Sequence, residues 1–272
     1  MWAMRICLWL GLTAVAAAQV SHSKALEVVA HRGASFDAPE NTMTAFRLGL
    51  QQGADAIEGD FHLTADGHIV CMHDRNAKRT GGVDRALATM TLAEVRQLDV
   101  GRWKGAAFAG ERVPTLSDVL AILPPDKKFL IEIKCGVEIL PELARVLAPH
   151  ASAFPRLRII SFDADVVAAV KREFPAIRAY WLTSLKRLAS DGDPPPMSVI
   201  LDTLKRTGAD GLDAHADLFD AYPELMAALR AHAYEVHAWT VDEPAVARRL
   251  SELKVDSITT NRPRFLRDAI AR

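Results

Sequence analysis

The sequence has few cysteines, almost no net charge and no hydrophobic run long enough to cross a bilayer. Its 272 residues include 3 cysteines, and 33 Lys and Arg residues balance 34 Asp and Glu residues to a net charge of −1. Because the basic residues are spread along the chain, the composition indicates no nucleic-acid partner and no polybasic membrane anchor. A hydrophobic fraction of 50% with 25% charged residues is typical of an ordinary globular protein.

The longest apolar run lies near the N-terminus, at residues 6–18, and follows a short segment that carries Arg5. This run is too short for a spanning helix and ends in small alanine residues, which suit cleavage by signal peptidase. The pattern predicts a signal peptide over residues 1–18, a mature protein that begins at Gln19, and a periplasmic or secreted location. A retained membrane-anchoring N-terminus is the alternative, and a stable membrane anchor is not expected.

Two cysteines, Cys71 and Cys135, remain in the predicted mature chain. In an oxidising compartment they could form one disulfide, which requires their Cα atoms to lie within roughly 7 Å of each other. Both stand in or beside strand-like segments, where cysteine packs as a small buried hydrophobe. We therefore expect free cysteines, with a disulfide as the alternative.

From residue 28 onward the sequence alternates between short β-branched runs and amphipathic stretches. The strand-like runs lie at 28–31, 56–60, 129–134, 158–162, 178–182, 211–213, 235–240 and 256–260. Apolar residues at three- and four-residue spacing predict helices at 43–52, 139–147, 164–174, 199–207, 223–232 and 244–253. Eight such units close into a parallel barrel, so we predict one α/β domain, a TIM (β/α)8 barrel over residues 19–272. An open doubly wound sheet is disfavoured because no glycine-rich turn follows the first strand.

Two segments interrupt this alternation. After the second strand, residues 61–68 form only a turn, and residues 69–73 form another strand-like run. This connection is too short for a parallel crossover, so it predicts a hairpin. A two-residue type I′ turn at Asp66-Gly67 would place His73 opposite Asp60.

The second interruption is a long insertion after the second barrel strand, at about residues 74–115, with one helical piece at 91–98. Long insertions at the strand-end face of a barrel are usually substrate lids or specificity caps. We therefore expect this insertion to cover the substrate site, with a purely structural excursion as the alternative.

Acidic side chains stand at the predicted carboxyl ends of the strands, which converge on one cavity in this fold. Glu58 and Asp60 are two residues apart on one strand, so they point to the same side, as do Glu132 and Lys134. Three carboxylates in one cavity repel one another unless a cation intervenes, and hard divalent ions prefer oxygen ligands. Glu58, Asp60 and Glu132 therefore predict a site for one Mg²⁺ or Ca²⁺ ion. Zinc would require more nitrogen or sulfur ligands.

Two cations and two histidines complete this set. Arg32 and Lys134 are aimed at the same cavity, and a phosphate group is the anion that would join them to the metal. Phosphoryl transfer also needs one group to accept a proton from the attacking oxygen and another to protonate the leaving oxygen. His31 and His73 are the candidates, because histidine titrates near neutral pH. For any one of these residues alone, a structural role is the alternative.

These residues occur in motifs that resemble those of the glycerophosphodiester phosphodiesterase family, in its bacterial, exported type. The motifs are Ala30-His31-Arg32-Gly33, Pro39-Glu40-Asn41-Thr42, Ile57-Glu58-Gly59-Asp60, Asp66-Gly67, His73-Asp74, Glu132-Ile133-Lys134 and Trp239-Thr240-Val241. The resemblance covers nearly the whole predicted mature chain and includes the insertion. It implies a barrel of the phospholipase C-like phosphodiesterase type.

The resemblance also implies a role for each candidate residue. It implies that His31 and His73 are the acid–base pair. The implied metal ligands are Glu58, Asp60 and Glu132. Arg32 and Lys134 would contact the phosphate. Trp239 would form an apolar wall for the glycerol or the alcohol. Gly59 and Asn261 depart from the family pattern; we expect Gly59 to loosen its strand and Asn261 to remove a negative charge near the site.

The implied reaction is metal-dependent hydrolysis of a small glycerophosphodiester, such as glycerophosphocholine or glycerophosphoethanolamine, to sn-glycerol 3-phosphate and an alcohol. One alternative is a lysophospholipase D type activity on lysophospholipids, which Trp103 and Phe108 in the insertion would favour as parts of an apolar cap. The other is a non-catalytic glycerophosphodiester-binding protein, although such a protein would be expected to have lost His31 or His73.

Overall fold

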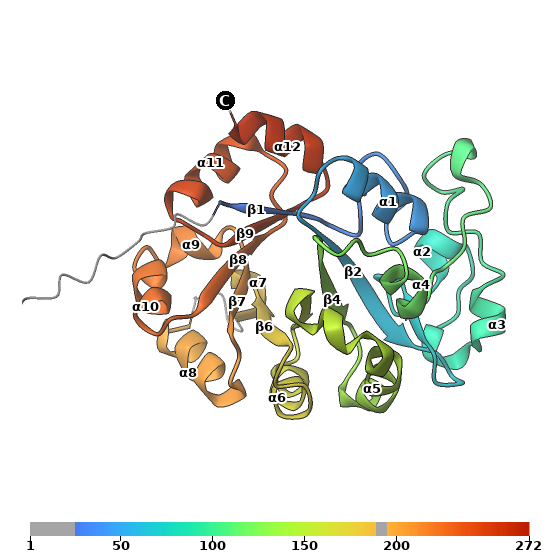
Figure 1. The fold of residues 1–272 in the computed structure, drawn as a ribbon, viewed down its shortest axis with the longest axis horizontal. Coiled ribbons are helices and arrows are strands. Elements are labelled where there is room, and N and C mark those ends of the chain that lie inside the picture. The colour runs from blue at the N-terminus through green and yellow to red at the C-terminus, as the bar shows by residue number, and fades with distance from the viewer. Residues whose placement is uncertain (1–24, 189–194, 272) are drawn as a thin grey trace, which may run out of the picture.

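The computed structural model describes residues 25–188 and 195–271, so the predicted signal peptide lies outside the described residues. In these ranges one sheet has the strand order β1-β9-β8-β7-β6-β5-β4-β2-β3, and β1 also pairs with β2. All pairs are parallel except β2 with β3, so eight strands close into a parallel barrel and β3 extends β2 at its edge. Figure 1 shows these strands at the centre, surrounded by helices. The predicted TIM barrel is confirmed.

All eight predicted barrel strands are present. They are β1 (Glu27–Ala30), β2 (Ala56–Leu63), β4 (Lys128–Ile133), β5 (Leu157–Ser161), β6 (Arg178–Thr183), β7 (Gly211–His215), β8 (Glu235–Trp239) and β9 (Ser257–Thr260). The largest difference from the predicted boundaries is at β2, which continues to Leu63 because its last residues pair with β3 (Ile69–Cys71).

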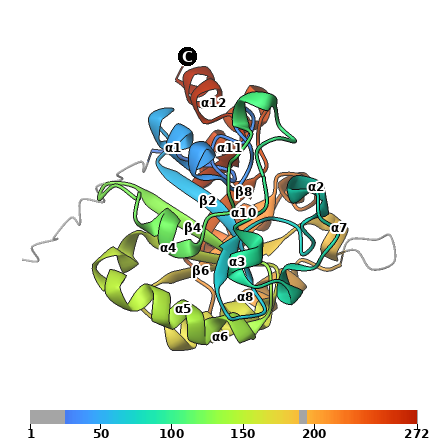
Figure 2. The same ribbon diagram turned by 90° about the vertical axis from the view of Figure 1, so that its right-hand side faces the viewer.

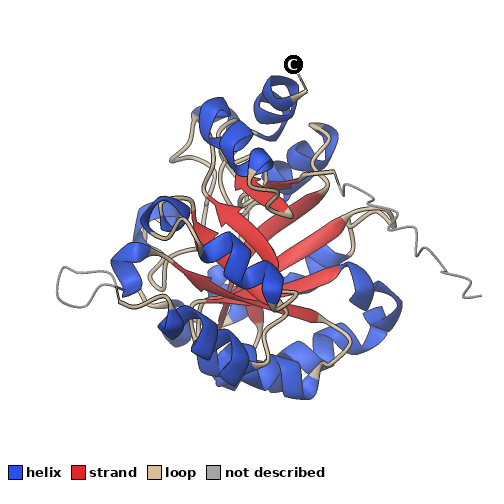
Figure 3. Ribbon diagram, turned by 90° about the vertical axis from the view of Figure 1, so that its left-hand side faces the viewer, coloured by secondary structure: helices blue, strands red, loops and turns tan. Residues whose placement is uncertain are grey.

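The six predicted helices between the strands are also present, and they cover the outside of the barrel (Figure 3). They are α1 (Met43–Gln51), α5 (Leu140–Leu147), α6 (Ala164–Glu173), α8 (Ser198–Thr207), α10 (Leu225–Ala231) and α11 (Pro244–Glu252). Further helices and 3-10 segments that were not predicted from the sequence are α4 (Leu116–Leu120), α7 (Leu185–Leu188), α9 (Leu218–Ala221), η3 (Val137–Ile139) and η4 (Ala148–Arg156). Across the described residues, every helix is too short or too polar to cross a bilayer.

The last helix, α12 (Pro263–Ile270), was also missed. This helix has 8 residues and buries Pro263 and Leu266. Proline at its first position favours a helix start, because that position has no hydrogen-bonded amide to lose.

The insertion after the hairpin folds around a small core of its own. It contains α2 (Lys78–Gly81), η1 (Leu87–Thr89), α3 (Leu92–Val95) and η2 (Ala106–Phe108). Its apolar side chains, which include Leu87, Val95 and Val113, cluster with Val70 and Met72 near the edge of the sheet. Figure 2 shows this insertion from outside, with α3 in front of the barrel. The insertion therefore packs against the hairpin side of the barrel.

The hairpin itself has a different register from the predicted one. Its loop has three residues and ends at Gly67, whose φ is +80°. The amide of Met72 donates to the carbonyl oxygen of Asp60 at 2.9 Å, so Met72 and not His73 lies opposite Asp60. The predicted two-residue turn was therefore wrong by one position.

A contact with the insertion accounts for this difference. The Asp66 carboxylate accepts a hydrogen bond from the Thr64 hydroxyl at 2.7 Å and another from the Leu92 amide at 2.9 Å. These bonds hold Asp66 in the middle of a three-residue loop, with Gly67 in the left-handed region that such loops require. Leu92 is remote from the turn in the sequence, so the turn residues alone do not indicate this contact.

Two expectations about small residues have different outcomes. Cys71 and Cys135 are both free, as expected. The expectation that Gly59 loosens its strand stays a prediction, but its surroundings explain why a glycine stands there: a Cβ would lie 2.9 Å from Cζ of Phe46 and 3.3 Å from Sγ of Cys71. Gly59 thus allows β2 to pack closely against α1.

Helix α1 also lies directly on the turn that follows β1. Thr42 caps the helix by accepting from the Ala45 amide at 3.2 Å, and Phe46 is fully buried. In the turn, Gly33 has φ +79°, and a Cβ there would lie 2.4 Å from the Ala45 carbonyl carbon. The position of Arg32 beside the strand end therefore depends on glycine at position 33.

We expect Gly33→Ala to lower the free energy of unfolding by at least ~2 kcal/mol, because strain at positive φ adds to a clash with the helix backbone. Gly67→Ala is the matched control: its φ is nearly the same, but no atom lies within 4 Å of the added methyl. Its loss should be close to ~1 kcal/mol. Denaturant unfolding measures both, and equal losses would contradict direct packing of α1 on the turn.

Candidate active site

The carboxyl ends of the barrel strands surround a small cavity of about 250 Å³ that joins a wider groove of about 840 Å³. The walls of both contain His73, Glu132, Lys134 and Phe162, so the two spaces are continuous at these residues. Only the small cavity is lined by His31, Arg32, Glu58 and Trp239. All the predicted site residues that line these spaces come from strand ends or from the turns after them.

Three buried carboxylates lie together at the floor of this site. One oxygen each from Glu58, Asp60 and Glu132 lies within 4.8 Å of the others. Glu58 and Asp60 share β2, and Asp60 stands opposite Glu132 across the parallel pair of β2 with β4. The structure thus brings together the three acids that the sequence proposed as metal ligands.

Burial and mutual repulsion shift the pKa of two of these acids upward. Burial, with the nearby Asp60 charge, raises the pKa of Glu132 to about 8 and that of Glu58 well above its usual range. Glu58 Oε1 and Asp60 Oδ1 are buried with no hydrogen-bond partner in the described part of the chain. Clustered oxygen atoms of this kind fit a hard divalent cation, which would offset the repulsion and coordinate the oxygens that accept no hydrogen bond.

Asp60 differs from its two neighbours because two cations face it. Although burial alone would raise the pKa of Asp60, Arg32 and Lys134 hold it well below its usual range. Arg32 Nε lies 3.2 Å from Asp60 Oδ2, and Lys134 Nζ lies 3.4 Å from Asp60 Oδ1. Lys134 also donates to Glu132 at 2.7 Å. The site therefore alternates acids with cations, and both predicted phosphate contacts reach it.

Arg32 is held in place from two further directions. Its backbone amide donates to Glu58 Oε2 at 2.8 Å, and its φ of 54° turns the chain sharply after β1. Its guanidinium also donates to Glu40 at 3.0 Å. These contacts fix the direction of the guanidinium before any anion binds.

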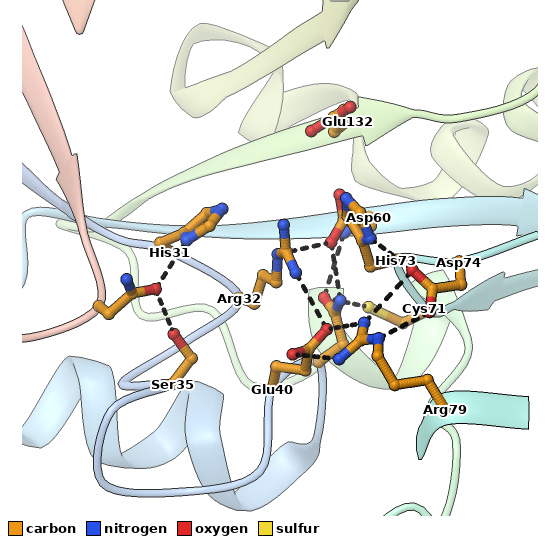
Figure 4. Close-up of polar contacts among 12 residues, drawn as sticks. His31, Arg32, Ser35, Glu40, Asp60, Cys71, His73, Asp74, Arg79 and Glu132 are labelled. Atoms are coloured by element: carbon orange, nitrogen blue, oxygen red, sulfur yellow. Dashed lines mark hydrogen bonds and ion pairs between the residues drawn. The ribbon is translucent and has the colours of Figure 1, made fainter. Parts of the chain in front are cut away.

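A second arginine, from the insertion, connects the two sides of the site (Figure 4). Arg79 donates to both oxygens of Glu40, at 2.7 and 2.9 Å, and to Asp74 Oδ2 at 2.7 Å. Glu40 supports Arg32, and Asp74 supports His73, whose Nδ1 lies 2.7 Å from Asp74 Oδ1. The insertion therefore positions two of the site residues, through Arg79.

The ring orientation of His31 is set by an amide. Asn261 donates from Nδ2 to Asp242 at 2.6 Å, so its Oδ1 faces His31 Nδ1 at 2.7 Å. Ser35 donates to the same Asn261 oxygen at 2.7 Å. Nδ1 of His31 must then carry the proton, which leaves Nε2 as an acceptor. Burial, together with Arg32, lowers the pKa of His31 to about 4, so the ring is neutral near pH 7.

His73 is oriented in a corresponding way by a carboxylate. Because Asp74 is bound by Arg79, its carboxylate is ionised and accepts from His73 Nδ1, which leaves His73 Nε2 unblocked. Burial lowers the pKa of His73, and Asp60 and Asp74 oppose that shift. Both imidazoles therefore keep one nitrogen available for proton transfer.

Trp239 lies in the cavity wall with its polar edge turned away. Its indole N–H donates to the Asp213 carbonyl oxygen at 3.2 Å, and its ring meets Phe162 edge to face at 5.5 Å. The tryptophan thus presents an apolar surface, together with Phe162. By contrast, Trp103 and Phe108 of the insertion line neither the cavity nor the groove.

Comparison with known proteins agrees with this geometry. A profile of the glycerophosphoryl diester phosphodiesterase family matches residues 31–265. This chain belongs to that family. It is 33% identical over 244 residues to a glycerophosphodiester phosphodiesterase of Caldanaerobacter subterraneus subsp. tengcongensis, which covers 88% of this chain and 95% of that protein. A glycerophosphodiester phosphodiesterase of Bacillus subtilis is 30% identical over 252 residues, or 86% of this chain and 83% of that protein.

Solved structures show the same relationship. A phosphodiesterase of Oleispira antarctica, in complex with the product sn-glycerol-3-phosphate, superimposes with a TM-score of 0.80 at 28% identity, covering 90% of this chain and 97% of that one. A glycerophosphodiester phosphodiesterase of Agrobacterium tumefaciens gives a TM-score of 0.74 at 28% identity, covering 89% and 98%. Membership of the glycerophosphoryl diester phosphodiesterase family makes the chain an enzyme, a phosphoric diester hydrolase.

Sequence analysis did not identify some of the polar residues that hold the site residues in place. Arg79 and Asp242 were not proposed at all, and Asn261 was noted only as the loss of a charge. Each acts through a partner on another element, so no spacing along the sequence reveals it. The motif at Glu40 was recognised, but its pairing with Arg79 depends on how the insertion folds.

The raised pKa of Glu132 predicts how the stability of the metal-free protein depends on pH. A carboxyl whose pKa rises on folding, here from 4.5 to about 8, loses folding stability as pH rises through that window. His31 has the opposite effect below pH 6.5, where its lowered pKa makes stability rise with pH. Between about pH 6.5 and 8 we therefore expect the unfolding free energy to fall by about 2 kcal/mol.

Denaturant unfolding of chelator-treated protein at these two pH values measures this loss. Saturating Mg²⁺ or Ca²⁺ should abolish the loss, and Glu132→Gln should reduce it because the titrating carboxyl is gone. An equal loss in wild type and Glu132→Gln would show that another group is responsible.

Proposed function

We propose that this chain is a metal-dependent glycerophosphodiester phosphodiesterase. Its substrates would be small diesters such as glycerophosphocholine or glycerophosphoethanolamine, and its products sn-glycerol 3-phosphate and an alcohol. The observation that carries the proposal is one cavity that joins a carboxylate cluster, two cations and two imidazoles with open nitrogens. The Oleispira antarctica neighbour, which holds sn-glycerol-3-phosphate as its product, supports the choice of substrate class.

The phosphate group would lie between Arg32 and Lys134, whose positions are fixed before it binds. A divalent ion held by Glu58, Asp60 and Glu132 would neutralise the carboxylates and withdraw charge from the phosphate oxygens. Mg²⁺ and Ca²⁺ both suit an all-oxygen set. The ion pairs of Arg32 and Lys134 with Asp60 keep both cations at the floor of the cavity.

The shape of the site indicates which histidine would be the general acid and which the general base. His31 lines only the small cavity, whereas His73 lines both the cavity and the open groove. An alcohol leaving through the groove would therefore take its proton from Nε2 of His73 in the imidazolium form, while Nδ1–H stays bonded to Asp74. Neutral His31 would remove a proton from the attacking oxygen through Nε2. That oxygen belongs to water or to the glycerol 2-hydroxyl; in the second case water later opens a cyclic phosphate.

The two alternatives have less support. A lysophospholipase D needs an apolar surface for an acyl chain, and Trp103 and Phe108 do not face the site. A binding protein without catalysis would not require both His31 and His73 to be oriented by separate hydrogen-bond partners.

We also propose that the enzyme is exported, on the strength of the signal-like pattern at residues 1–18. Protein recovered from the periplasm or medium of an expressing bacterium should begin at Gln19 when its N-terminus is sequenced. Recovery in the cytoplasm with residues 1–18 intact would contradict export.

Release of glycerol phosphate from glycerophosphocholine tests the reaction directly. We expect activity with Mg²⁺ or Ca²⁺ and none in excess chelator. His73→Ala should lower kcat by at least ~100-fold, because general acid–base groups contribute that much or more.

His68→Ala is the matched control, since His68 lies on the same hairpin but outside the cavity and the groove. It should keep near wild-type activity. Full activity in chelator would remove the metal from the mechanism, and full activity of His73→Ala would remove that histidine.

A further inference from the structure

One carboxylate in the cavity has no role in the mechanism above. Asp213, on β7, is 1% exposed and lines the small cavity together with Leu182 and Trp239. Its Oδ1 atom is buried without a hydrogen-bond partner in the described chain. Burial raises its pKa to about 6. A buried polar group without a partner is destabilising, so its presence calls for an explanation.

The neighbouring residues do not supply one. His237 lies opposite Asp213 in the pairing of β7 with β8, but its Nδ1 is 2.7 Å from the Ser257 hydroxyl. Its Nε2 lies 3.6 Å from a Glu235 oxygen, and its ring packs on Tyr180 at 4.2 Å. That Nε2 atom has no hydrogen-bond partner in the described chain, and the charge of a protonated His237 would lower the pKa of Asp213. Within the described residues, however, no hydrogen bond joins Asp213 Oδ1 to His237.

Asp213 also stands apart from the acidic cluster. Among the described residues, the acids whose oxygens gather within 4.8 Å are Glu58, Asp60 and Glu132, without Asp213. Arg32 and Lys134 pair with Asp60 and not with Asp213. The Asp213 carboxylate is therefore available to something that enters the cavity.

The chemistry of the cavity selects what that ligand is. A volume of about 250 Å³ with walls of Ile160, Phe162, Leu182 and Trp239 suits a short carbon chain better than a large head group. Once a divalent ion occupies the carboxylate cluster, Arg32 and Lys134 in the same cavity would disfavour an ammonium group there. A hydroxyl, which is neutral and donates a hydrogen bond, avoids that repulsion and satisfies the carboxylate.

We propose that Asp213 accepts a hydrogen bond from a hydroxyl of the glycerol half of the substrate, and so selects a polyol phosphate in the small cavity. This inference rests on the proposed function, because it assumes a glycerophosphodiester in the site. The variable alcohol then occupies the open groove, on the side of His73. Asp213 is a specificity residue here and takes no part in the transfer of protons.

Calorimetric binding of two phosphates to the Mg²⁺- or Ca²⁺-loaded protein tests the proposal. Propyl phosphate has the chain of sn-glycerol 3-phosphate without its hydroxyls. The wild type should bind glycerol 3-phosphate at least ~10-fold more tightly than propyl phosphate, as expected for a hydrogen bond to a charged acceptor. Asp213→Ala should bind both with the weaker affinity.

Asp163→Asn is the matched control, because Asp163 lines the groove and not the small cavity, and asparagine keeps its capping role at α6. It should keep the wild-type preference for glycerol 3-phosphate. A preference that persists in Asp213→Ala, or an equal loss of affinity for both ligands, would overturn the proposal.

Unfolding measurements separate a ligand-binding role from a structural one. If Asp213 acts on the ligand, Asp213→Leu without ligand should unfold at the same or a higher denaturant concentration than the wild type, because an unpartnered buried carboxyl is removed. A marked loss of stability in both Asp213→Leu and Asp213→Asn would show a structural role. Failure of the wild type to hydrolyse glycerophosphocholine would instead overturn the proposed function, whatever the binding ratio.

Discussion

Strands β2 and β4 pair in parallel with Asp60 opposite Glu132, and this register places three carboxylates where water hardly reaches. The rest of the site follows from the need to balance that charge. Arg32 and Lys134 offset part of it and hold Asp60 ionised, while Glu58 and Glu132 keep raised pKa values. The negative charge that remains on the carboxylates gives the site affinity for a cation, and the two basic residues give it affinity for a phosphate.

Around this floor, the site has a narrow part and a wide part. His31 and Asp213 line only the small cavity, whereas His73 stands where the cavity meets the groove. Each histidine is oriented by a different kind of partner: an amide held by Asp242 for His31, and a carboxylate held by Arg79 for His73. This asymmetry distinguishes the side of the attacking oxygen from the side of the leaving alcohol.

The sequence was sufficient for features that depend on local periodicity. Strand spacing predicted the barrel, and the two-residue separation of Glu58 and Asp60 correctly placed both on one side of β2. Features that depend on contacts between distant segments were missed or wrong. The hairpin register was decided by the bond from Leu92 to Asp66, and Arg79 reaches Glu40 only because the insertion folds over the hairpin edge. In the sequence Asp213 resembles an ordinary strand residue, because only the three-dimensional structure shows that its Oδ1 atom is buried without a hydrogen-bond partner in the described chain.

The central claim is that Glu58, Asp60 and Glu132 gather around one divalent cation. Crystals grown with Mn²⁺ in place of Mg²⁺ allow the ion to be located by its anomalous scattering. The account predicts one strong peak among the three carboxylates, within about 2.0–2.6 Å of an oxygen of each, as hard divalent ions require. Absence of a peak there, with the three side chains turned apart, would contradict it.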